Sequence, residues 1–168
     1  MNTAWQNEFQ TRMGQFGASK LKGFIPVSIK LRVESGCFHR EHSPEAYRLI
    51  DQYLTGMGKL DVSFKFEEHE SGPEILAYLA VTTAGLVLAK SLVELLTAIV
   101  KARSEGIKRG DRPSQPVEVI VRGYWEDSNY FEERIIRLPP ENAATTKLLE
   151  DAFIRQGPKP EKPKRGSE

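Results

Sequence analysis

The side chains best suited to metal or nucleophile chemistry occur in two short stretches of this chain. The single cysteine, Cys37, stands in the sequence CFHREH together with His39 and His42, and the remaining histidine, His69, stands in EEHES. Thiolate and imidazole are ligands that zinc prefers, and four of them close a structural zinc site. The spacing C-x-H-x-x-H departs from the established zinc signatures, and lone histidines in polar loops are usually just solvated. These four residues are the candidate metal ligands of the chain.

Other chemistries have less support in the sequence. A Cys–His pair is the minimum for nucleophilic catalysis, but no Asp or Asn that would orient the histidine can be identified. The acidic run at 67–70, together with Asp61, offers oxygen ligands for magnesium, although neighbouring carboxylates in a loop are usually a solvated surface. Phosphate-binding, dinucleotide-binding, nucleophile-elbow and H-E-x-x-H patterns are absent from the sequence. We therefore predict a non-enzymatic protein without catalytic residues, cofactor or small-molecule substrate.

Length and composition are those of one soluble globular domain. The chain has 168 residues, of which 39% are hydrophobic and 28% charged, and its net charge is +1. A single cysteine cannot form a disulfide within the chain, and the first twenty residues contain no apolar signal segment. We therefore expect a cytoplasmic location.

Two basic segments, 101–112 and 159–165, could in principle contact phosphate groups. Acidic residues dilute both segments, and no aromatic residue interleaves with the basic ones to stack on bases. We do not expect nucleic acid as a partner.

The most hydrophobic part of the chain runs from Ile75 to Val100. The sequence SGPE before it is typical of a helix start, so the stretch predicts one long apolar central helix over about 73–104. We interpret it as a buried core helix, with a membrane span through residues 75–93 as the alternative. A span needs about 20 apolar residues, whereas the charge-free run from Ile75 to Ala89 has fifteen.

The remaining elements alternate between strand and helix patterns. Strands are predicted at 24–34, 60–67, 117–124 and 130–138, and helices at 43–56 and 139–157. With the central helix, the order is strand, helix, strand, helix, strand, strand, helix. This order predicts an α/β (α+β) fold, a two-layer sandwich with a four-stranded mixed sheet. We divide the chain into an N-terminal arm (1–24), a single α/β domain (25–156) and a disordered tail rich in proline and lysine (157–168).

Two groups of aromatic and apolar residues are candidates for contacts with a protein. The arm carries a stripe at helical spacing, which packs on its own domain or on a partner, and the second group flanks the turn between the last two strands. The predicted interaction residues are Trp5, Phe9, Met13, Phe16, Tyr124, Trp125 and Tyr130.

The layout from 25 to 155 resembles the effector-associated constant component family of bacterial conflict systems. The resemblance lies in the element order, in the small-residue stretch AVTTAGLVLAKSLVELLTAIVKAR, in the hairpin VEVIVRGYWEDSNYFEERIIRL and in the closing helix AATTKLLEDAF. The family typically has a tryptophan late in the central helix and a short glycine turn, and this sequence has neither. The resemblance implies a small non-enzymatic α/β domain that couples effectors to sensing modules in antiviral defence or signalling.

From these observations we predict a non-catalytic protein-interaction or adaptor domain that binds a protein partner or forms a homo-oligomer. One alternative is a membrane-anchored accessory protein that uses the predicted 75–100 helix. The other alternative is a metal-binding domain or enzyme that uses Cys37, His39, His42 and His69.

Overall fold

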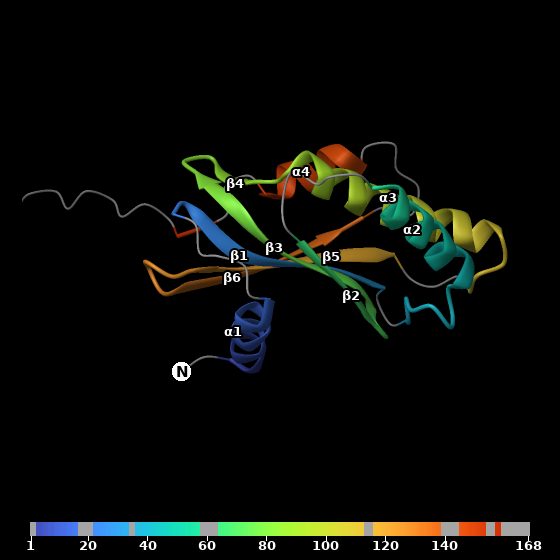
Figure 1. Cartoon of the computed structure of the whole chain (residues 1–168), viewed down its shortest axis with the longest axis horizontal. Helices are drawn as coiled ribbons and strands as arrows, with labels where there is room; N and C mark the ends of the chain where they lie inside the picture. Colours follow the sequence, from blue (N-terminus) through green and yellow to red (C-terminus); the bar gives the residue numbers. More distant parts are fainter. Residues whose placement is uncertain are drawn as a thin grey trace, which may run out of the picture.

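A computed structural model describes residues 3–16, 22–33, 36–57, 64–112, 116–138, 145–153 and 157–158. The described part of the chain is a mixed α/β protein with a six-stranded sheet and four helices (Figure 1). In chain order the elements are α1 (Ala4–Phe16), β1 (Phe24–Val33), α2 (Pro44–Gly56), β2 (Phe64–His69), β3 (Gly72–Thr82), β4 (Gly85–Val87), α3 (Lys90–Lys108), β5 (Val117–Trp125), β6 (Tyr130–Arg137) and α4 (Thr145–Phe153).

The sheet has the strand order β2-β3-β1-β5-β6, and β4 pairs with the far end of β3. All of these pairings are antiparallel. The predicted four-stranded mixed sheet is therefore wrong in strand number and direction, because β2 and β3 form a hairpin that places β3 between β1 and β2. The strands β1 and β2 still run in the same direction, so the segments that follow them reach the same edge of the sheet.

The predicted central helix is the largest error of the sequence analysis. Its first half forms β3 and β4, and α3 begins only at Lys90. Ile75 and Ala77 of β3 belong to the main core, whereas Leu76 belongs to the cluster under α1. A strand that is buried on both faces reads as a continuous apolar run and cannot be told from a buried helix by periodicity. Gly72, expected in a helix start, instead lies so close to β1 that a Cβ would be 1.8 Å from the Leu31 carbonyl oxygen.

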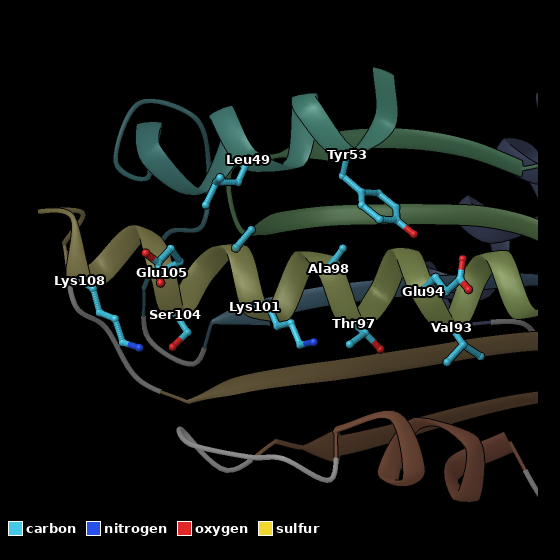
Figure 2. A pocket seen from close by; sticks show the side chains of 11 residues that line it. Leu49, Tyr53, Val93, Glu94, Thr97, Ala98, Lys101, Ser104, Glu105 and Lys108 are labelled. Atoms are coloured by element: carbon cyan, nitrogen blue, oxygen red, sulfur yellow. The ribbon is translucent and has the colours of Figure 1, made fainter. Parts of the chain in front are cut away.

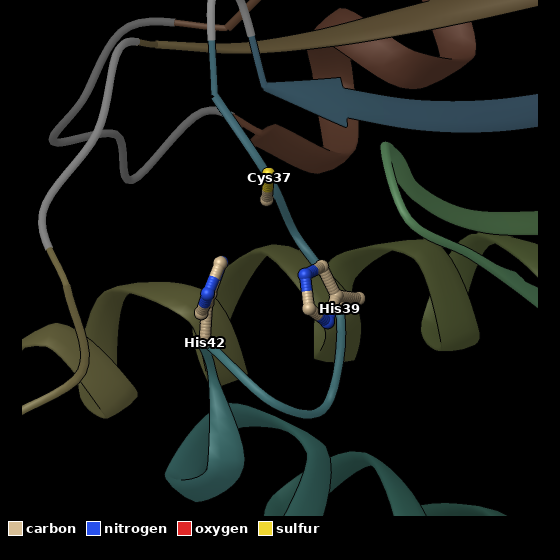
Figure 3. Close-up of side chains that lie close together, drawn as sticks. All are labelled: Cys37, His39 and His42. Atoms are coloured by element: carbon tan, nitrogen blue, oxygen red, sulfur yellow. The ribbon is translucent and has the colours of Figure 1, made fainter.

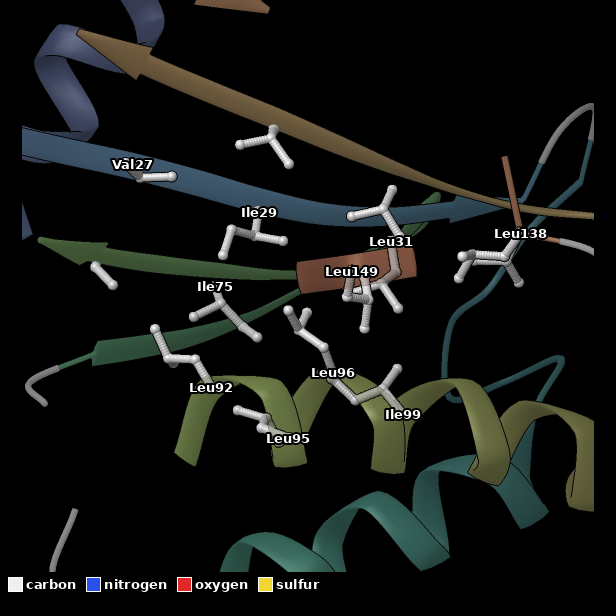
Figure 4. Packing of buried hydrophobic residues seen from close by; sticks show 14 of the residues in the cluster. Val27, Ile29, Leu31, Ile75, Leu92, Leu95, Leu96, Ile99, Leu138 and Leu149 are labelled. Carbon is white, nitrogen blue, oxygen red and sulfur yellow. The ribbon is translucent and has the colours of Figure 1, made fainter. Parts of the chain in front are cut away.

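The main hydrophobic core lies between the sheet and the layer formed by α2, α3 and α4 (Figure 4). Alternate residues of β1, such as Ile29 and Leu31, point into it and are fully buried. They meet Leu92, Leu96 and other residues at helical spacing on α3, while Leu149 closes the layer from α4. This core fixes the position of α2 relative to the end of β1, and the segment that joins them carries the candidate metal ligands.

The opposite face of the sheet is partly covered by α1 (Figure 1). The helix α1 occupies the predicted N-terminal arm and packs on its own domain through Phe9 and Met13, which are each only 4% exposed. The predicted strand at 24–34, helix at 43–56 and terminal hairpin correspond to β1, α2 and the β5–β6 pair.

Several predicted segments lie partly outside the described residues. They are the first half of the strand at 60–67, both ends of the helix at 139–157 and most of the tail at 157–168. None of the helices in the described segments is long and apolar enough to cross a membrane.

Candidate metal centre

The loop between β1 and α2 brings together three of the four predicted ligands. One ligand atom from each of Cys37, His39 and His42 lies within 4.8 Å of the other two (Figure 3). The two imidazole rings approach with centroids 4.4 Å apart, and all three side chains are half-buried. The candidate centre is thus a compact, half-buried group on one loop.

The spacing of these donors is close to what a tetrahedral metal requires. Zinc bonds of 2.0–2.1 Å to nitrogen and 2.3 Å to sulfur place neighbouring ligand atoms about 3.3–3.8 Å apart. The donors of Cys37, His39 and His42 lie within 4.8 Å of one another, so they are already near the spacing at which one ion could bind all three.

The backbone of the loop is anchored at Phe38, between the first two ligands. The Phe38 N–H donates to the carbonyl oxygen of Glu70 at 3.1 Å, and the Phe38 carbonyl accepts from the Tyr47 hydroxyl at 2.8 Å. The Phe38 ring is fully buried, with the guanidinium of Arg103 5.6 Å from its centroid. Burial raises the pKa of Tyr47, which keeps this hydroxyl protonated as the donor. The loop is therefore tied to the β2–β3 turn and to α2.

Arg40 ties the same loop to its neighbours from the outside. Its guanidinium makes a bidentate pair with Asp51 of α2, also pairs with Glu68 of β2, and lies over the ring of Tyr47. The hydrogen bond from Arg40 holds the pKa of Asp51 below its usual range. These groups are exposed, so their contribution is to the geometry of the loop more than to stability.

A distant carboxylate fixes the start of α2, directly after His42. Asp111, only 6% exposed, accepts from the backbone N–H groups of Glu45 and Ala46 at 3.1 and 2.9 Å. It thereby caps a helix whose own Ser43 makes no side-chain cap bond. A Cβ on Gly106 would lie 2.2 Å from Asp111 Oδ2, so this close approach of α3 requires glycine.

One hydrogen bond must be given up when His39 binds a metal. The backbone N–H of Glu41 donates to His39 Nδ1 at 3.3 Å, so this nitrogen acts as the acceptor in this arrangement. A metal bound at Nδ1 would use the lone pair that accepts from Glu41. A metal bound at Nε2 would leave the ring proton on Nδ1. In both cases the hydrogen bond from the Glu41 N–H would be lost. The bond is long and Glu41 is exposed, so water can replace it at small cost.

His69, the fourth predicted ligand, is not part of this group. Its β-strand position directs it to the α1 side of the sheet, where its Nε2 lies 3.1 Å from Glu74 and 3.4 Å from Glu67. The segments that follow β1 and β2 meet at one edge of the sheet, where the Phe38 N–H donates to the Glu70 carbonyl oxygen. The sequence could not show that His69 points to the other face.

In the acidic run that was considered for magnesium, Glu67 and Glu68 form ion pairs with different basic side chains. Glu67 pairs with Arg12 and Lys65, whereas Glu68 pairs with Arg40. Burial by itself raises the pKa of Glu67, but hydrogen bonds from Lys65 and Arg12 outweigh it and hold the pKa below its usual value. Asp61, considered with them, lies outside the described residues.

The residues predicted for protein contacts have partners within the chain. Trp5, Phe16 and Tyr124 pack around the cluster of Phe9, Met13 and Leu76. Trp125 belongs to the main core on the other face, and Tyr130 packs against it. That the chain is an interaction or adaptor domain stays a prediction.

No sequence pattern indicated the groove between α2 and α3 (Figure 2). It has a volume of about 850 Å³ and is lined by Leu49 and Tyr53 of α2 and by successive turns of α3 from Val93 to Lys108. Its floor is apolar and its rim carries both acidic and basic side chains, and we assign no ligand to it.

Comparisons of the chain with family models, curated proteins and solved structures found no match. The resemblance to the effector-associated constant component family therefore stays a prediction.

Proposed function

We propose that this protein binds a transition-metal ion through Cys37, His39 and His42, and that zinc is the preferred ion. The observation that carries the proposal is the mutual approach of the three ligand atoms within 4.8 Å on a loop whose backbone is anchored by its neighbours. The fourth coordination position is filled by water in this proposal.

The donor set decides between classes of metal. Calcium and magnesium take oxygen ligands, whereas a thiolate with two imidazoles suits zinc and copper. Cobalt and nickel fit the same donors less tightly than copper. One sulfur and two nitrogens are also the trigonal ligand set of blue-copper sites. Zinc is proposed because three protein ligands with an open fourth position are typical of catalytic zinc sites.

The anchoring of the loop argues for a preformed centre. The bonds at Phe38, Arg40 and Asp111 hold it without any metal ligand, so the free energy of metal binding is not needed to fold the loop. Structural zinc sites in small domains behave differently, because there metal binding drives folding. We therefore expect a folded protein with and without the ion, and we assign no reaction to the centre.

Calorimetry on the full chain tests the proposal. The protein is stripped with EDTA, dialysed and titrated with zinc, and we expect a single zinc ion per chain. Cys37→Ser, His39→Asn and His42→Asn each remove a ligand and should weaken binding by about tenfold or more. The matched control is His69→Asn, which lies outside the centre and should bind like the wild type.

Loss of binding in His69→Asn, or unchanged binding in Cys37→Ser, would contradict the ligand set. Circular dichroism of each variant distinguishes loss of a ligand from loss of the fold.

A further inference from the structure

The helix α1 is held against the sheet by a thin layer of side chains. Phe9 and Met13 pack on Leu76 of β3, and aromatic rings surround this contact. Trp5 meets Phe131 edge-on with centroids 5.8 Å apart. The main core on the other face has many more buried residues from three helices. The contact of α1 is therefore small beside the rest of the fold.

Two carboxylates bind α1 at the edge of this layer, and both have other partners on the sheet. Glu74, only 3% exposed, pairs with Arg12 of α1 but also accepts from Ser28 Oγ at 2.6 Å and lies 3.1 Å from His69. Glu67, which also pairs with Arg12, lies 3.1 Å from Lys65. When α1 leaves, neither carboxylate is left as a buried charge without a partner.

The aromatic residues under α1 are also organised independently of it. Tyr124 stacks on Phe131 with centroids 4.3 Å apart, and its hydroxyl donates to Asn129 at 3.1 Å. Arg122, which lies over the ring of Trp5, also pairs with Glu133 of β6 at 2.6 Å. The sheet thus keeps a preformed aromatic surface beside two carboxylates when α1 is absent.

We propose that this surface is a receptor for an amphipathic helix of a partner protein, and that α1 occupies it in the closed state. A fitting helix carries aromatic residues four positions apart, as Trp5 and Phe9 are, and a cation seven positions after the first, as Arg12 is. The apolar side chains enter the aromatic layer, and the cation meets Glu67 and Glu74. The charge of these two carboxylates selects basic over acidic partner helices.

This proposal is independent of the metal centre, which lies on the connection that leads to the other face of the sheet. It also gives the predicted adaptor role a defined surface. Because α1 is tethered through residues 17–23, its effective concentration at the face is in the millimolar range for such a short link. A partner helix therefore binds weakly until α1 is released, so α1 sets the threshold for binding.

The probe is a labelled peptide of residues 3–17, titrated by fluorescence anisotropy into two full-length proteins. In the variant Phe9→Asp/Met13→Asp the chain's own helix is released, and we expect saturable binding of the peptide. Binding to the wild type should be at least about tenfold weaker, because α1 occupies the face. Among matched peptides with the same charge change, Arg12→Gln should bind less well, and Gln15→Glu, at an exposed position, should bind like the original.

If the double variant fails to fold, a protease site placed between residues 17 and 21 of the otherwise wild-type chain serves instead. After cleavage, exchange of α1 with the labelled peptide supports the proposal. Absence of saturable binding to a folded double variant, or absence of exchange after cleavage, overturns it. Concentration-dependent association of wild-type chains through α1 would make the occupant a second copy and would also overturn it.

Discussion

The loop from Cys37 to His42 and the helix α1 are attached to the protein in opposite ways. The loop is held by its backbone, through the N–H and carbonyl of Phe38, while the side chains of the candidate ligands are half-buried. The helix α1 satisfies its backbone internally and is held by side chains such as Phe9, Met13 and Arg12. The first arrangement fits the preformed metal centre that we propose, and the second fits the release of α1 that we propose.

The comparison also separates the two faces of the sheet. The face under α2, α3 and α4 forms the main hydrophobic core, which also positions the loop from Cys37 to His42. The face under α1 has only the small cluster around Phe9 and Met13. Changes in the first should therefore unfold the protein, and changes in the second should mainly release α1.

The largest difference is expected between Leu96→Ala and Met13→Ala. Leu96 is fully buried between α3 and the sheet, so its truncation leaves a cavity and lowers the free energy of unfolding by about 2–5 kcal/mol. Met13→Ala should cost less than about 2 kcal/mol, because α1 can detach instead of leaving a cavity. Urea denaturation measures both values, and hydrogen exchange should show faster exchange of α1 amides only in Met13→Ala.

Equal losses in the two variants, with uniform exchange, would mean that α1 is an integral part of the core.

The next effect concerns Gly106, which lets α3 approach the start of α2. Gly106→Ala places a methyl group against Asp111 and the backbone nitrogen of Ala46, and should destabilise the protein by about 1–3 kcal/mol. The matched control is Gly14→Ala in α1, where nothing lies within 4 Å of the added Cβ. That change should stabilise α1 by about 0.5–1 kcal/mol. Thermal denaturation should show a lower melting temperature for Gly106→Ala and a higher one for Gly14→Ala.

Gly106→Ala without loss of stability would show that Asp111 does not need its present position.

A smaller effect on stability is expected for Tyr47→Phe, which removes the hydroxyl that donates to Phe38. The loss of this buried hydrogen bond should cost about 1 kcal/mol. Its consequence for the metal centre is larger, because the ligands on either side of Phe38 lose their fixed geometry, and we expect about a tenfold loss of zinc affinity. Tyr53→Phe, on the same helix, is the control. Unchanged affinity in Tyr47→Phe would mean that the loop does not need this anchor.

The smallest effect is expected for Arg12→Gln, about 1 kcal/mol near neutral pH. Because the folded protein holds the pKa of Glu67 below its usual value, the ionised carboxylate contributes stability above the ordinary pKa and loses it as the pH falls through the lowered one. The variant lacks part of this contribution, so the stabilities of wild type and variant should converge as the pH falls from the ordinary glutamate pKa through the lowered pKa of Glu67. A constant difference across the pH range, measured by urea denaturation, would exclude an ionic origin.

Local patterns in the sequence predicted the elements whose burial is one-sided. The alternation in β1 and the helical spacing in α2 reflect one buried face each, so periodicity identified them, whereas α3 was predicted only as the end of a longer helix. The strand β3 is buried on both faces, by the main core and by α1, and its apolar run therefore resembled a helix. That error also hid the β2–β3 hairpin and with it the antiparallel sheet.

The proximity of the three candidate ligands could be predicted from residue type and closeness in the sequence, but the contacts that support their loop could not. Cys37, His39 and His42 are within six residues of each other, so a single loop brings them together. Asp111 caps α2 from a position far along the chain, and only the packing of α3 on α2 reveals the pairing. Exclusion of His69 depended on which face of β2 it occupies, which follows from the pairing register.

Anomalous diffraction at the zinc absorption edge, from crystals grown with zinc, tests the central claim most directly. The account predicts one strong peak bonded to Cys37 Sγ and to a nitrogen of each of His39 and His42, with a solvent ligand completing the tetrahedron. A peak bonded to His69 and its neighbouring carboxylates, or zinc density confined to surface sites without Cys37, would contradict it.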